Sequence, residues 1–228
     1  LVVAILATGG FRIATLVLSR AEDVVVVLAA VVALRLLVRP VEVPRLDPRK
    51  AVAIGVLLYA LFMSFIVVTR HVALRTHALD LGYYVQVVWS VANGRGAYVT
   101  LPPMHAWGDH LSPILYLLVP LGWIWPGAAS LLVAQTLILA SGALAMFGYA
   151  ARRLGGPAAA TFALLYLVNP SLHGINLRDL HPAAFVIPLI VWAALAFDTG
   201  RLVWCAVALV GVLACREDAA IAVVGFGV

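Results

Sequence analysis

The chain has 228 residues, of which 64% are hydrophobic and 11% are charged, and its formal net charge is +5. A soluble domain carries about 25% charged residues and cannot bury so much apolar surface, so the composition excludes that class. The basic residues are spread over short loops between apolar segments. This distribution argues against nucleic-acid binding and indicates loops that face the cytoplasm and contact anionic membrane lipid.

The N-terminal part, residues 1–50, is predicted to be a transmembrane hairpin followed by a basic loop. Two apolar segments, 1–18 and 24–38, are separated by a short charged turn. Segment 39–50 then combines three prolines with four basic residues, which breaks helical structure and predicts a cytoplasmic location. Segment 51–69 is uncharged and long enough to cross the membrane outward as a helix.

Residues 70–126 are predicted to form a large extracytoplasmic loop. Its last part, 111–125, is apolar, but it is short and contains Pro113 and Pro120. If this segment crossed the membrane, the next crossing would carry Arg152 and Arg153 outside, against the positive-inside rule. We therefore expect 111–125 to lie at the membrane interface.

The rest of the module, residues 51–228, is predicted to be an all-α transmembrane bundle. Segment 128–150 would run inward and end at its two arginines, and its small residues from Ala140 to Ala145 predict close helix packing. Segments 158–168, 183–197 and 202–214 would then cross out, in and out. Because an apolar run continues to the last residue, the sequence is expected to be a fragment truncated at its C-terminus.

Segment 80–94 has the pattern of an amphipathic helix at the membrane surface. Tyr83, Gln86, Ser90 and Asn93 form a polar stripe at a 3.6-residue period. Asp80 stands at the start of this helix, where two interpretations stay open. It could cap the helix, since aspartate is a favoured N-cap, or it could be a reactive carboxylate.

Three further clusters of ionisable residues are predicted to lie on the same, outer side. Each taken alone is typical of a solvated loop or a structural ion pair, but their convergence on one side favours a site. Their spacing selects no metal, so a divalent cation stays an open question. The candidates are Asp109 and His110, then Arg178, Asp179 and His181, then Arg216, Glu217 and Asp218.

Several short motifs occur together in a recognisable order. They include Leu79-Asp80-Leu81-Gly82, Gly108-Asp109-His110-Leu111-Ser112-Pro113, Asp179-Leu180-His181-Pro182 and Cys215-Arg216-Glu217-Asp218. The sequence from about residue 57 onward resembles the prokaryotic membrane family called domain of unknown function 2079. That family is distantly similar to the GT-C glycosyltransferases, which use polyprenyl-phosphate sugars.

The resemblance implies a GT-C-like fold, with interfacial helices in a large first extracytoplasmic loop and an acidic catalytic residue early in that loop. Asp80 occupies the corresponding position. The protein mannosyltransferases have an acidic pair there, whereas this sequence has Asp80-Leu81. The implied location is the prokaryotic inner membrane, with the site facing outward.

The leading hypothesis is an inverting glycosyl transfer from a polyprenyl-phosphate sugar, with Asp80 as general base. Tyr83 and Gln86 and the three ionisable clusters would bind the substrates, and no P-loop or other soluble nucleotide-binding motif is present. One alternative is a transporter or channel component that uses the same carboxylates and histidines. Another is a non-catalytic membrane scaffold, in which Asp80 is only a helix cap.

Overall fold

The computed structural model describes residues 11–13, 16–18, 31, 34, 35, 38 and 46–227, in two units, Leu1–Leu46 and Asp47–Val228. In the first unit, β1 (Phe11–Ile13) pairs antiparallel with β2 (Leu16–Leu18). These six residues belong to the segment 1–18, which the sequence predicts to be the first half of a transmembrane hairpin. The remainder of segment 1–18 lies outside the described residues, as do most of segments 24–38 and 39–50.

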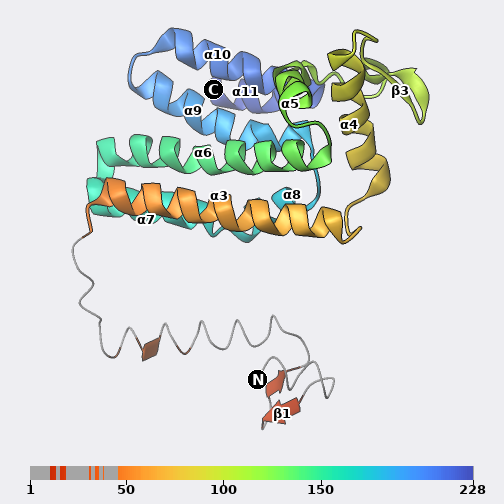
Figure 1. Cartoon of the computed structure of the whole chain (residues 1–228). Coiled ribbons are helices and arrows are strands. Elements are labelled where there is room, and N and C mark those ends of the chain that lie inside the picture. Colours follow the sequence, from red (N-terminus) through yellow and green to blue (C-terminus); the bar gives the residue numbers. More distant parts are fainter. Residues whose placement is uncertain are drawn as a thin grey trace. The chain divides into compact units, whose positions relative to one another are not determined.

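The second unit is a layered helical bundle (Figure 1). Helix α6 (Ala128–Leu154) lies at its centre and contacts α3 (Pro48–Val72), α7 (Gly156–Leu167) and α9 (Val186–Asp198). Helix α10 (Leu202–Leu213) packs on α9, and α11 (Ala220–Gly227) follows it. Helix α8 (Pro170–Leu177) continues the line of α7 toward the other end of the bundle.

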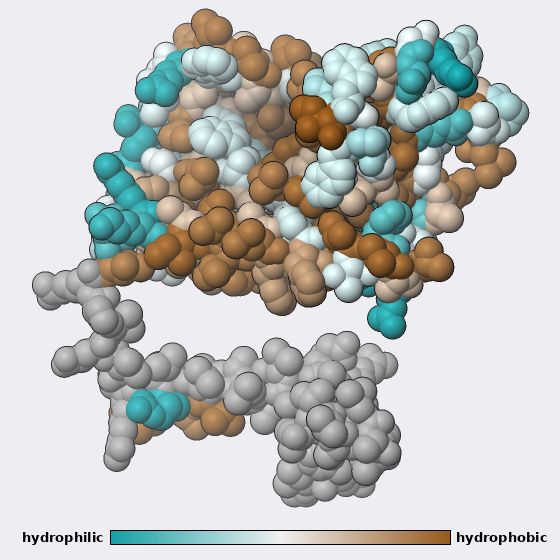
Figure 2. Space-filling view, viewed as in Figure 1, coloured by the Kyte–Doolittle hydropathy of each residue, from teal (hydrophilic) through white to brown (hydrophobic). Residues whose placement is uncertain are grey.

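Three helical stretches in residues 46–227 are long and apolar enough to cross a membrane: Pro48–Val72, Ala128–Leu154 and Gly156–Leu177. Apolar side chains cover the outward face of α3, where Leu58, Phe62 and Phe65 are all exposed (Figure 2). Exposed apolar surface of this kind is expected where lipid is the solvent. These helices support an integral membrane protein, as the sequence predicted.

Capping residues and small residues explain where the long helices begin and how they pack. Asp47 accepts hydrogen bonds from the backbone N–H groups of Arg49 and Lys50, at 2.8 and 3.2 Å, and Pro48 fits the first turn of α3. Ala140, Gly142, Ala143 and Ala145 of α6 are buried, and a Cβ at Gly142 would collide with the Tyr166 hydroxyl of α7. The predicted close packing of this segment is confirmed.

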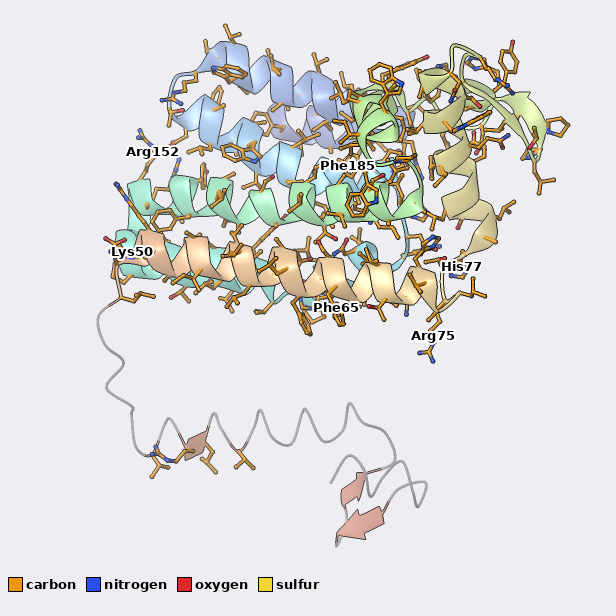
Figure 3. The ribbon with its side chains drawn as sticks, viewed as in Figure 1. Lys50, Phe65, Arg75, His77, Arg152 and Phe185 are labelled. Carbon is orange, nitrogen blue, oxygen red and sulfur yellow. The ribbon has the colours of Figure 1, made fainter. Side chains whose placement is uncertain are left out.

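Lys50 and Arg152 lie at one end of the bundle, which we call the basic end, and further arginines, among them Arg75, lie at the opposite end. Figure 3 places Lys50 and Arg152 at this end and His77 and Arg75 at the opposite end. Arg152 and Arg153 each bind Asp198 at the end of α9, with N–O distances of 2.5 Å. The start of α3 and the ends of α6 and α9 therefore lie together at this end of the bundle.

At the opposite end, the chain forms short elements that lie across the helix ends. Helix α4 (Ala78–Ala92) is followed by the β3–β4 hairpin (Tyr98–Thr100 and Pro103–His105) and the 3₁₀-helix η1 (Ala106–Gly108). Segment 111–125 forms η2 (Pro113–Leu118) and α5 (Val119–Ile124), both too short to cross a membrane. Two further 3₁₀-helices, η3 (Pro182–Phe185) and η4 (Glu217–Ala219), complete this end.

The polar stripe of α4 is only partly exposed: Ser90 is buried, Tyr83 and Gln86 are half-buried, and Asn93 is exposed. The stripe also binds the hairpin and the 3₁₀-helix after it: Ser90 donates to the Tyr98 carbonyl of β3, and Tyr83 donates to the Ala106 carbonyl of η1, both at 3.0 Å. The opposite face of α4 packs into the bundle through Leu81, Val87 and Val88. A polar side chain that binds a backbone group inside the protein gives the same periodic sequence pattern as one that faces water.

Candidate active site at the end of the bundle

A cavity of about 620 Å³ opens at the end of the bundle opposite the basic end. Four stretches of the chain that are distant in sequence form its wall: the start of α4, the hairpin and the loop after it, the junction of α8 and η3, and the turn before η4. Seven of the eleven predicted site residues line it: Asp80, Tyr83, Asp109, His110, Arg178, His181 and Arg216.

Asp80 lies in the first turn of α4, but it does not cap that helix. The N-cap is His77, and within residues 46–227 the Asp80 carboxylate accepts no backbone hydrogen bond. Among the described residues, the nearest ionisable partner of its carboxylate is His181, with 3.9 Å between Asp80 Oδ2 and His181 Nε2. That distance is too long for a hydrogen bond, so the carboxylate stays available to a molecule in the cavity.

The loop 109–114 is fastened to the segment that follows α10. Glu217 accepts hydrogen bonds from the Leu111 N–H at 3.0 Å and contacts His110 Nδ1 at 2.8 Å, and the Ile114 N–H donates to the Ala214 carbonyl. The His110 contact is the largest cause that holds the pKa of Glu217 below its ordinary value. The contact therefore stabilises the fold at neutral pH, and this contribution is lost as pH falls through the lowered pKa.

Two arginines bring positive charge to the cavity in different ways. Arg216 forms a bidentate pair with Asp218, which holds the pKa of that carboxyl below its ordinary value. Arg178 follows the last residue of α8 and is exposed, and its guanidinium has no ion pair within the described residues. An unpaired guanidinium beside a cavity is suited to bidentate binding of a phosphate or carboxylate.

Tyr84 also lines the cavity, although the sequence analysis did not select it. Burial is the largest cause that raises its pKa to about 12; the nearby Tyr83, Asp109 and Asp80 act in the same direction, and Arg216 opposes them. Its ring meets that of His181 edge to face, with 6.0 Å between centroids. Tyr84 thus remains a neutral hydrogen-bond donor. It lies off the predicted polar stripe, so no sequence signal pointed to it.

Four predicted site residues do not line the cavity but support it. Gln86 binds Thr100 of the hairpin through both ends of its amide, at 3.0 and 3.1 Å. Glu217 and Asp218 hold His110 and Arg216, as described above. Asp179 is 2% exposed and accepts a hydrogen bond from the His77 N–H at 2.7 Å. Each of these four residues thus makes contacts within the protein, and the substrate-binding role that the sequence predicts for them stays a prediction.

No group of three or more metal-binding side chains with metal-site geometry occurs among the described residues. The cavity-lining groups closest to such a set are the carboxylates of Asp80 and Asp109, with His110 and His181 beside them.

Residues 70–228 match the family described as predicted membrane protein (DUF2079). The chain belongs to this family. The match includes every residue that lines the cavity, so the cavity lies entirely within the DUF2079 part of the chain. Neither the curated proteins nor the solved structures contain a match.

Proposed function

We propose that the cavity is the active site of a membrane glycosyltransferase that takes a sugar from a polyprenyl-phosphate donor. The observation that carries this proposal is that Asp80 forms no cap and shares its cavity with Arg178 and Arg216. A carboxylate that can accept a proton and cations that can bind an anionic leaving group are the two functions that this reaction needs.

In the proposed reaction, the acceptor hydroxyl oxygen attacks the anomeric carbon of the donor and inverts it. The Asp80 carboxylate takes the hydroxyl proton, and the bond between the anomeric carbon and the phosphate oxygen breaks. The electron pair of that bond stays on the polyprenyl phosphate. Arg178 and Arg216 bind the departing phosphate, and Asp218 fixes the Arg216 guanidinium in one orientation.

The donor is expected to reach the cavity from the membrane, since the cavity lies at the end of helices that are long enough to cross a bilayer. We propose that the protein resides in the prokaryotic inner membrane with the basic end in the cytoplasm and the cavity outside. In this arrangement, α9 and α10 also cross in a GT-C-like bundle. Both are short for about 30 Å of hydrocarbon, so their crossing needs local thinning of the bilayer.

The proposed orientation predicts the labelling of single cysteines by a membrane-impermeant maleimide in intact cells. In a background without Cys205 and Cys215, Arg95→Cys is expected to react and Leu154→Cys to resist until the cells are permeabilised. Both positions are exposed in the bundle, so solvent access is matched. Labelling of both cysteines in intact cells would contradict the proposed sides.

Replacement of Arg178 tests the proposed phosphate contact. Because a charge-assisted hydrogen bond contributes about 1.5–3 kcal/mol, Arg178→Gln is expected to raise the Kd for a polyprenyl-phosphate sugar by about 10- to 100-fold. Arg201→Gln is the matched control, since Arg201 is an exposed arginine at the N-cap of α10, three residues after Asp198. Equal donor affinity in both variants and the wild type would contradict the phosphate contact.

A further inference from the structure

Asp179 joins two parts of the cavity wall that are far apart in sequence. Its buried carboxylate accepts the His77 N–H at 2.7 Å, across 102 residues of chain. His77 is the N-cap of α4, and its carbonyl accepts the Leu81 N–H in the first helical turn. The Asp179 side chain therefore fixes the point at which α4 begins, three residues before Asp80.

Gln135 holds the backbone on both sides of Asp179. Its side chain is fully buried in α6, where Nε2 donates to the Asp179 carbonyl at 2.7 Å and Oε1 accepts the His181 N–H at 2.8 Å. Asp179 itself has a φ of 71°, a left-handed conformation that aspartate and asparagine adopt more readily than other non-glycine residues. One buried amide thus fixes the turn that carries both Asp179 and His181.

These contacts link both members of the pair formed by Asp80 and His181, which are 3.9 Å apart. Asp80 is attached to Asp179 through the first turn of α4, and His181 is attached to it through the turn that Gln135 holds. If the contact between Asp179 and His77 is lost, α4 keeps only its hairpin and bundle contacts, and the start of the helix is released.

We propose that Asp179 is a positioning residue that sets the place of Asp80 in the cavity through the start of α4. It acts as a hydrogen-bond acceptor in a left-handed turn, not as a charge, so asparagine should replace it and alanine should not. Its effect on turnover rests on the proposed glycosyl transfer, whereas its effect on α4 does not.

The test compares Asp179→Asn with Asp179→Ala in the full chain, by hydrogen exchange and by sugar transfer from a polyprenyl-phosphate hexose. Asp179→Asn is expected to match the wild type in both. Asp179→Ala is expected to speed exchange of the first bonded amides of α4 by roughly fivefold, the value of one hydrogen bond, while α9 and α10 stay unchanged. It is also expected to lower kcat by about tenfold or more.

A double variant separates positioning from general loss of structure. If Asp179 acts through Asp80, then Asp179→Ala should lower the rate of Asp80→Asn little further, whereas independent effects would multiply. The proposal is overturned if Asp179→Asn loses transfer with normal exchange, since the carboxylate would then have a chemical role. It is also overturned if Asp179→Ala leaves α4 exchange unchanged. Absence of transfer by the wild type would remove the proposed function but leave the exchange test intact.

Discussion

Asp80→Asn is expected to lower the rate of sugar transfer by a factor on the order of 10² to 10⁴, the usual contribution of a positioned general base. The amide has nearly the shape of the carboxylate but cannot accept the acceptor's proton. Because Asp80 accepts no backbone hydrogen bond within the described residues, the substitution removes no cap and should leave the melting temperature unchanged. The measurement is kcat with a polyprenyl-phosphate sugar, together with a thermal melt in the same detergent.

Asp47→Asn provides a matched control at the basic end. Asp47 does cap a helix, α3, and asparagine caps about as well as aspartate, so this variant should keep both stability and transfer. Unchanged kcat in Asp80→Asn would remove Asp80 from the mechanism and favour a structural role for the cavity. A fall in both kcat and melting temperature would indicate that Asp80 supports the fold.

Gln135→Met is expected to destabilise the protein by about 2–6 kcal/mol. Methionine fills a similar volume, but it leaves the Asp179 carbonyl and the His181 N–H without partners, and each unpaired buried group costs about 1–3 kcal/mol. The loss should appear as a lower melting temperature, with the release of α4 that Asp179→Ala also produces.

Gln86→Met is the control for this substitution, because it removes a glutamine whose bonds to Thr100 are exposed. Water can replace those bonds, so the cost should stay near 1 kcal/mol or below. Equal stability of the Gln135 and Gln86 variants would show that the buried amide does not hold the Asp179 turn.

The sequence carried enough information to predict the long helices and to indicate which residues of the candidate site lie near one another. Uncharged runs of sufficient length predicted α3 and α6, and the arginines after α6 indicated which helix ends lie together. The convergence of Asp80, Asp109, Arg178 and Arg216 on one cavity follows from that alternation of helix directions. Patterns of this kind are local, so one sequence is sufficient to read them.

The division of those residues into cavity-lining and supporting groups could not be predicted. Asp179 and His181 are two residues apart in one motif, yet His181 faces the cavity and Asp179 is buried against His77. Gln86 lies on the same stripe as Tyr83, yet it binds Thr100 of the hairpin and does not line the cavity. These outcomes depend on contacts made across the fold, which neither helical periodicity nor residue type determines.

The central claim is that the cavity around Asp80 transfers a sugar from a lipid phosphate. It is tested most directly by incubating the purified full chain, in liposomes, with a radiolabelled polyprenyl-phosphate hexose and a mixture of hydroxyl acceptors. The account predicts a labelled product and free polyprenyl phosphate in equal amounts, both absent with Asp80→Asn. No turnover with any polyprenyl-phosphate sugar, together with Asp80-dependent movement of protons or cations across the same liposomes, would contradict it and identify a transporter.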